Sequence, residues 1–135
     1  MTEMRHKPRN VLVTGGAGFI GSNFVRYLLK ADENVRVTNL DALTYAGSRL
    51  NLHGVEQGNP SRYKFIEGDI CDFNVVFKIF KQEDIDTVVH LAAESHVDRS
   101  IDGPAEFLKT NIMGTSVLLE VARQVWKDRE DVRFH

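Results

Sequence analysis

The sequence predicts an α/β fold, a doubly wound parallel sheet with helices packed on both faces. One observation is the alternation of short apolar runs with longer segments of helical periodicity along a chain of 135 residues. Such a strand–helix–strand order gives parallel strands joined by right-handed crossovers. The other is the run at 86–91, whose apolar residues suit a strand that is covered on both faces.

Strands are expected at 10–14, 35–40, 63–67, 86–91 and from 132 to the last residue, 135. Helices are expected at 19–31, from Asp72 onward and over 104–126, with a short helical candidate near 49–52. Asp72 is a good N-cap, and the apolar residues that follow it recur at helical spacing. The sequence therefore predicts one domain over 10–135 that is truncated at the start of its fifth strand, preceded by a disordered tail over 1–9.

The segment 104–126 is apolar on more than one side. Pro104 suits the first turn of a helix, and the apolar positions that follow it cover more than one face. A helix of this kind is buried on more than one side. One side covers the sheet, and the other needs a further partner, either a second subunit in a homodimer or a missing part of the same chain.

Composition and charge argue against several classes of function. A net charge of −2 gives no electrostatic basis for binding nucleic acid or an acidic membrane surface. Cys71 is the single cysteine, so no intrachain disulfide can form and a reducing compartment fits. No apolar run approaches the roughly 18 residues that span a bilayer, and the polar leader is not a secretory signal. A cytoplasmic protein without a metal site is expected.

The most informative stretch is the glycine-rich turn between the first strand and the first helix. Glycines at 15, 18 and 21 form the pattern G-x-x-G-x-x-G, a relative of the dinucleotide-binding fingerprint of Rossmann-type sheets. Without side chains, the backbone can approach a pyrophosphate, which the free N–H groups at a helix N-terminus favour. The alternative is a merely tight strand–helix turn.

Asp41 ends the second strand, 20 positions beyond Gly21. An acidic residue at this distance accepts hydrogen bonds from the ribose hydroxyls of the adenosine. Its charge also repels the additional phosphate of NADP, so the expected cofactor is NAD. The alternative is that Asp41 only caps the turn that follows it.

Two further loops leave the carboxyl ends of strands, where ligands of open α/β sheets bind. Asp69 follows the third strand, where it accepts the exocyclic amine of adenine or simply helps to cap the next helix. The loop after the fourth strand begins with the small residues Ala92 and Ala93, which permit a close backbone approach, and continues with a dense set of polar residues. A solvated loop has the same composition, so both interpretations remain open.

Four tracts together resemble one family. They are T-G-G-A-G-F-I-G at 14–21, D-A-L-T-Y-A-G at 41–47, G-D-I-C-D at 68–72 and H-L-A-A-E-S-H-V-D-R-S-I at 90–101. These tracts resemble the dTDP-glucose 4,6-dehydratases, which belong to the extended short-chain dehydrogenase/reductase group. The resemblance covers nearly the whole chain from Asn10, and the second and fourth tracts are its most specific parts.

The resemblance implies an NAD site and assigns residues to it. The implied residues are Gly15, Gly18, Phe19, Ile20, Gly21, Asp41, Ala42, Leu43, Thr44, Asp69, Ile70, Leu91, Ala92, Ala93, Glu94, Ser95 and Thr110. Among these, Ser95 is also implied to reach the sugar nucleotide. Ala42 departs from the family, which commonly carries lysine there, and the departure removes a cation near the adenosine.

The resemblance also implies a reaction, the conversion of dTDP-glucose to dTDP-4-keto-6-deoxyglucose, a precursor of deoxysugars such as rhamnose. NAD takes a hydride from C4, water leaves across C5 and C6, and the hydride returns to C6. The family uses a Tyr-x-x-x-Lys pair as the base and an Asp–Glu pair for the elimination. This sequence contains neither, because none of Tyr27, Tyr45 and Tyr63 has a lysine four places later and the Asp–Glu segment is expected beyond His135.

The expected protein is therefore the N-terminal, cofactor-binding part of such a dehydratase, inactive alone. Two alternatives remain. One is another NAD-dependent sugar-nucleotide enzyme, such as a 4-epimerase or a decarboxylase. The other is a non-catalytic dinucleotide-binding module, which also predicts the missing Tyr-x-x-x-Lys.

Overall fold

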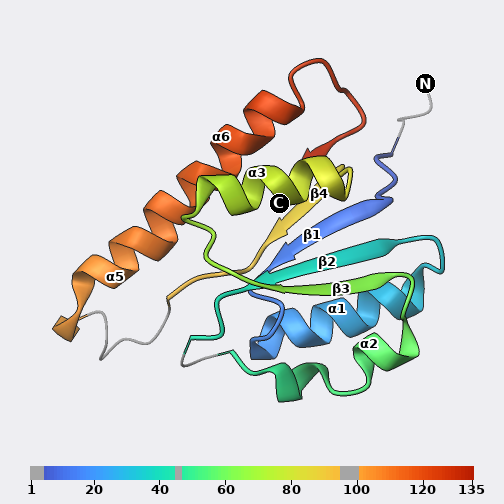
Figure 1. The fold of residues 1–135 in the computed structure, drawn as a ribbon, viewed down its shortest axis with the longest axis horizontal. Helices are drawn as coiled ribbons and strands as arrows, with labels where there is room; N and C mark the ends of the chain where they lie inside the picture. The colour runs from blue at the N-terminus through green and yellow to red at the C-terminus, as the bar shows by residue number, and fades with distance from the viewer. Residues whose placement is uncertain (1–4, 45–46, 95–100) are drawn as a thin grey trace.

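A parallel sheet runs through the middle of the molecule in the computed structural model, which describes residues 5–44, 47–94 and 101–135 (Figure 1). The described residues form five strands: β1 (Asn10–Thr14), β2 (Arg36–Asp41), β3 (Tyr63–Glu67), β4 (Thr87–His90) and β5 (Arg133–Phe134). Their order is β3-β2-β1-β4-β5, and every neighbouring pair is parallel. The predicted doubly wound parallel sheet is confirmed.

The helices lie on both faces of this sheet (Figure 1). They are α1 (Phe19–Ala31), the short η1 (Arg49–Leu52) and α2 (Val55–Gly58), α3 (Phe73–Gln82), α5 (Pro104–Leu108), η2 (Lys109–Gly114) and α6 (Thr115–Val125). In Figure 1, α1 and α2 lie below the sheet, and α3 and α6 lie above it. Two apolar clusters fill the two interfaces, and β1 contributes to both, with Val11 and Val13 in one and Leu12 in the other.

The direction of winding reverses between β1 and β4. From β1 the chain moves to β2 and β3 on one side, and then crosses to β4 and β5 on the other side of β1. The connections that follow β1 and β4 therefore lead toward opposite sides of the sheet. This is the switch point at which open α/β sheets bind ligands.

The expected single helix over 104–126 differs in detail from the structure. The segment begins at Pro104 as predicted, but a π-helical turn, η2, separates α5 from α6, which ends at Val125. Gly114 closes this turn against the side chain of Ile70, where a Cβ atom would collide. A sequence pattern does not reveal such a turn, because the distant Ile70 forms part of its packing.

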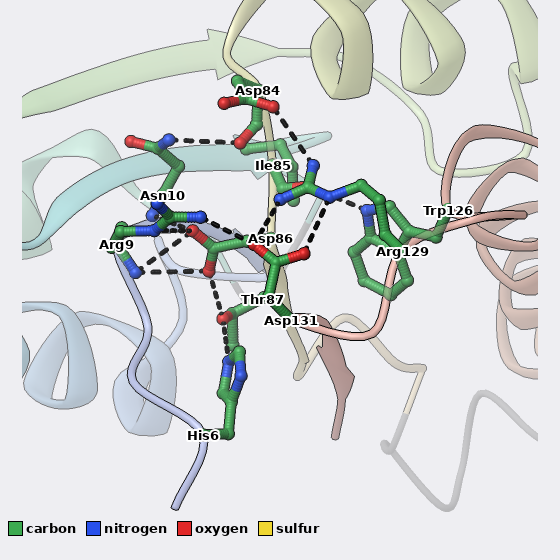
Figure 2. A network of polar contacts seen from close by, with 10 residues as sticks. All are labelled: His6, Arg9, Asn10, Asp84, Ile85, Asp86, Thr87, Trp126, Arg129 and Asp131. Carbon is green, nitrogen blue, oxygen red and sulfur yellow. Dashed lines mark hydrogen bonds and ion pairs between the residues drawn. The ribbon is translucent and has the colours of Figure 1, made fainter. Parts of the chain in front are cut away.

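A buried carboxylate organises the amino end of the sheet, opposite the switch point (Figure 2). Asp86, directly before β4, is fully buried and accepts hydrogen bonds from the backbone N–H groups of Arg9, at 3.2 Å, and Asn10, at 2.9 Å. The Thr87 hydroxyl donates to it at 2.6 Å, and the His6 ring nitrogen lies 2.7 Å from the same hydroxyl. The described part of the segment assigned to a tail, residues 5–9, thus contacts β4.

A neighbouring set of contacts attaches the end of α6 to the same edge (Figure 2). The Trp126 indole N–H donates to the backbone carbonyl of Ile85 at 2.8 Å. The Arg129 guanidinium pairs with Asp84 and Asp131, each at 3.1 Å. The buried indole bond attaches the end of α6 to the amino end of the sheet, and the ion pairs lie nearer the surface around it.

Among the described residues, no helix combines the length and apolarity that crossing a bilayer requires.

Replacing Asp86 with alanine removes the acceptor of two backbone N–H groups in a buried place. We expect the free energy of unfolding, measured by urea denaturation, to fall on the order of 1–3 kcal/mol. Asp131→Ala is the matched control, because this exposed carboxylate pairs with arginines only at the surface, and it should leave the unfolding midpoint nearly unchanged. An Asp86→Ala variant as stable as the control would contradict this role.

Candidate functional site

A cavity of about 420 Å³ opens at the carboxyl ends of the strands. Segments that follow β1, β2, β3 and β4 line it, and α5 and η2 complete its wall through Glu106, Lys109 and Thr110. The residues that line it are Gly15, Gly18, Phe19, Ile20, Gly21, Leu40, Asp41, Ala42, Thr44, Gly47, Gly68, Asp69, Ile70, Leu91, Ala92, Ala93, Glu94, Glu106, Lys109 and Thr110.

The glycine turn forms the floor of this cavity. Gly15 has a φ of +72°, and a Cβ atom on it would lie 2.7 Å from the backbone of Ala92. A Cβ atom on Gly21 would collide with the carbonyl oxygen of Gly15. The turn therefore packs backbone to backbone, both on itself and on the loop after β4.

The N-terminus of α1 opens into the cavity without a side-chain cap. Its N-cap is Gly18, which makes no side-chain hydrogen bond, and its first turn contains no acidic residue. The first N–H groups of a helix lack intrahelical acceptors and carry the positive end of the helix dipole. This end of α1 is therefore suited to a phosphate group.

Asp41 lies beside this helix end. Because β1 pairs with β2 so that Thr14 faces Leu40, Asp41 follows directly at the mouth of the glycine turn. Its carboxylate is largely buried and accepts hydrogen bonds from the N–H groups of Ala17, at 2.9 Å, and Leu43, at 2.7 Å. Each bond uses a different oxygen, so each oxygen keeps a lone pair for a ligand hydroxyl.

Asp69 and Ile70 line the part of the cavity beyond β3. Asp72, and not Asp69, provides the side-chain cap of α3, since its carboxylate accepts the N–H of Val75. One oxygen of Asp69 accepts the N–H of Cys71 at 2.8 Å, and the ammonium of Lys109 lies 3.9 Å from the other. Asp69 is half-exposed and remains available to a ligand.

The loop after β4 forms the opposite wall and is attached at two points. The hydroxyl oxygen of Thr14 accepts the N–H groups of Leu91, at 3.1 Å, and Ala92, at 3.2 Å. The side-chain amide of Asn111 accepts the N–H of Glu94 at 2.8 Å and donates to its carbonyl at 3.0 Å. The loop is thereby joined both to the glycine turn and to η2.

The structure brings the predicted site residues together in this one cavity, with two exceptions. Leu43 packs its side chain against the apolar cluster under α1, at a φ of 53°, and only its N–H reaches Asp41. Ser95, assigned to both the cofactor and the sugar nucleotide, lies outside the described residues.

Sequence reasoning did not identify several residues of the site. Gly47, Gly68, Glu106 and Lys109 line the cavity, and the buried side chain of Asn39 accepts the N–H of Gly16 at 3.0 Å. Asn39 had a recognisable signal, because an amide in a buried strand needs a hydrogen-bond partner. Glu106 and Lys109 had none, since only the tertiary fold brings their helix to the carboxyl end of β3.

Residues 12–135 match the family model described as GDP-mannose 4,6 dehydratase. The chain belongs to this family. The dTDP-glucose 4,6-dehydratase of Salmonella typhimurium is 51% identical over 130 residues, which cover 93% of the chain and 35% of that protein. The resemblance predicted from the sequence is confirmed.

Solved structures of similar proteins share the fold. The dTDP-glucose 4,6-dehydratase of Streptomyces venezuelae, crystallised with NAD and TYD bound, superposes with a TM-score of 0.78 at 48% identity, covering 86% of the chain and 36% of that structure. The UDP-glucose 4-epimerase of Thermotoga maritima gives 0.74 at 38% identity, covering 86% and 34%. The chain thus spans about a third of the length of the relatives it matches.

The packing of the glycine turn can be tested by adding one methyl group. Gly21→Ala should lower the free energy of unfolding by about 1–3 kcal/mol, because the new Cβ atom meets the Gly15 carbonyl. Gly58→Ala is the control: no atom lies within 4 Å of its Cβ position, so stability should be unchanged or slightly raised. Urea denaturation measures both, and equal stability of the two variants would contradict the packing.

Proposed function

We propose that the chain is the NAD-binding, N-terminal part of a dTDP-glucose 4,6-dehydratase. The observation that carries this proposal is the single cavity in which the uncapped end of α1 and the carboxylate of Asp41 lie side by side. The identity of about half of all residues to a dTDP-glucose 4,6-dehydratase supports the choice of activity.

We assign the parts of NAD to this cavity in order. The pyrophosphate would bind the free N–H groups at Phe19 and Ile20, next to a turn in which Gly15 and Gly21 have no room for side chains. The free lone pairs of Asp41 would accept the ribose hydroxyls of the adenosine, and its charge would disfavour the additional phosphate of NADP. Asp69 and Ile70 would contact the adenine.

The nicotinamide half would lie along the other wall. This wall consists of the backbone at 91–94 together with Thr110, and the small Ala92 and Ala93 leave room for a close approach. Ser95 would continue it toward the sugar nucleotide. Bound NAD would supply a reversible hydride acceptor, which the family uses to oxidise C4 of the glucose and later to reduce C6.

The residues of this chain would bind and orient the cofactor, and the proton transfers need other groups. The sequence lacks the Tyr-x-x-x-Lys base of the family. The lyase activity is accordingly proposed for a longer parent protein, and the chain of 135 residues is expected to be inactive alone.

A second candidate is a sugar-nucleotide 4-epimerase, because the epimerase from Thermotoga maritima has a similar fold. Its 38% identity is lower than the 48% and 51% of the dehydratases. Incubating a parent enzyme with NAD and dTDP-glucose separates the candidates, since a dehydratase yields a 4-keto-6-deoxy sugar and an epimerase only inverts C4.

We further propose that the chain forms a homodimer through α5, η2 and α6. Four large apolar side chains on this segment are about half-exposed: Leu108, Ile112, Met113 and Leu119. On the other side of α6, Leu118 and Val121 are buried in the core. An apolar strip of this kind marks an interaction surface.

We also propose that the protein is located in the cytoplasm. The single cysteine supports this location, because no intrachain disulfide can form and a reducing compartment fits.

NAD binding should depend on Asp41. Asp41→Ala removes the acceptor of the ribose hydroxyls, and we expect calorimetry to show binding weaker by about 1–3 kcal/mol. Asp131→Ala, at the amino end of the sheet, should bind NAD as the unsubstituted chain does. Unchanged affinity in Asp41→Ala, with the fold intact by circular dichroism, would remove Asp41 from the site.

The dimer should depend on Ile112. Sedimentation equilibrium should show dimers of the unsubstituted chain. Ile112→Asp should shift them to monomers, because it places a charge in the apolar strip. The control is Leu50→Asp, the same change at a still more exposed leucine on η1, beneath the opposite face of the sheet. An unsubstituted chain that is monomeric at every concentration would refute the homodimer. Another part of a longer chain would then cover the apolar strip.

A further inference from the structure

A hydrogen-bonded histidine connects the two walls of the cavity from behind. His90 is the last residue of β4, and its half-buried ring lies between two threonines. Its Nδ1 is 2.6 Å from the hydroxyl oxygen of Thr14, and its Nε2 is 2.8 Å from that of Thr115. Thr14 precedes the glycine turn and Thr115 follows η2. The ring therefore joins the two segments that hold residues 91–94, which we call the cofactor wall.

The hydrogen bonds of Thr14 determine the protonation of Nδ1. The Thr14 hydroxyl oxygen accepts the N–H groups of Leu91 and Ala92, which occupies both of its lone pairs. Its hydrogen must therefore be donated, and within the described segments His90 Nδ1 is the acceptor in reach. Nδ1 consequently carries no hydrogen.

The hydrogen bonds of Thr115 determine Nε2 independently. The Thr115 hydroxyl donates to the backbone carbonyl of Asn111 at 2.9 Å. Its oxygen is then free to accept, so Nε2 donates to it. The same Asn111 holds Glu94 through both groups of its side-chain amide. The two ends of the ring thus agree on a single form, the neutral Nε2–H tautomer.

We propose that His90 is a positioning residue that, as the neutral Nε2–H tautomer, holds the cofactor wall at 91–94 in place through Thr14 and Asn111. Protonation at Nδ1 would point a hydrogen at the Thr14 hydroxyl, whose lone pairs are already used. Thr14 must then release one of the two backbone N–H groups. Because Leu91 also donates to the backbone carbonyl of Thr14 at 3.1 Å, the attachment that the wall can lose is that of Ala92. The role in cofactor binding rests on the proposed function, whereas the tautomer does not.

The surroundings of the ring favour the neutral form. Burial lowers the pKa of His90 below its ordinary value of about 6.5, because the charged imidazolium loses hydration. The groups that face it are Thr14 from β1, the edge of the Phe134 ring from β5, with centroids 6.3 Å apart, and Thr115 from α6. The titratable neighbour is His135, directly after β5, whose backbone carbonyl accepts the His90 amide N–H.

The sign of the pH effect follows from this shift. The folded-state pKa is lowered, so between the two pKa values the unfolded chain binds a proton that the folded chain refuses. Stability contributed by the neutral ring is therefore full above about pH 6.5 and is lost as the pH falls through the unfolded and then the folded pKa. The cofactor wall should loosen as the pH falls through the folded-state pKa of His90.

The first test is NMR of the ¹⁵N-labelled chain without any substitution. We expect His90 to be the Nε2–H tautomer at pH 7.5. On acidification the amide signals of Leu91, Ala92 and Glu94 should shift together with the His90 ring, at one common midpoint below 6.5. An Nδ1–H tautomer, or amide signals that do not follow the ring, would overturn the proposal.

The second test is the affinity for NAD as a function of pH. Binding should weaken about five- to tenfold as His90 is protonated, the change expected for one lost hydrogen bond. Thr14→Val, which cannot donate to Nδ1 or accept the two amides, should be weak at every pH, and Thr14→Ser should restore the profile. His53→Gln is the control, because this exposed residue on the far side of α1 should leave the profile unchanged.

The two tests separate two kinds of failure. Absence of NAD binding at every pH, with the expected tautomer and coupled amide shifts, would overturn the proposed function and the cofactor role of His90. Normal NAD binding with a flat pH profile, or a Thr14→Val chain that binds as well as Thr14→Ser, would overturn the positioning role alone.

Discussion

The contact on which the site depends is between two stretches of backbone. Gly15 lies against the main chain of Leu91 and Ala92, in a space too small for a Cβ atom. This contact exists because β1 pairs in parallel with both β2 and β4, so the first residues beyond each strand emerge side by side. The glycine turn, Asp41 and the loop after β4 are brought to one cavity by the register of the sheet, and side chains then adjust what the backbone has placed.

The two ends of the strands have opposite roles. At the amino end, the buried Asp86 accepts hydrogen bonds from the backbone of Arg9 and Asn10 and from the Thr87 hydroxyl, which fixes β1 against β4. At the carboxyl end, the first N–H groups of α1 have no side-chain cap. The hydrogen bonds at the amino end thus fix the strands, and the strands place the free N–H donors at the carboxyl end where a ligand can bind.

The sequence predicted the parts of this arrangement that depend on local backbone chemistry. Three such features are visible along the chain: glycines at fixed spacing, an acidic residue at the end of the second apolar run, and small residues after the fourth apolar run. These residues line the cavity. The features it did not predict need partners far away in the sequence. Asn39 bonds to Gly16, His90 lies between Thr14 and Thr115, and the π-helical turn closes on Ile70. Leu43 shows the converse, because a residue within the expected ribose loop turns its side chain into the core.

The central claim is that the bare backbone at the start of α1 and the carboxylate of Asp41 bind one adenosine diphosphate moiety from two sides. A crystal structure of the chain with NAD tests this most directly. The account predicts pyrophosphate oxygens within hydrogen-bonding distance of the N–H groups of Phe19 and Ile20, and the adenosine ribose on Asp41. A dinucleotide bound elsewhere, or bound here with its ribose away from Asp41, would contradict it.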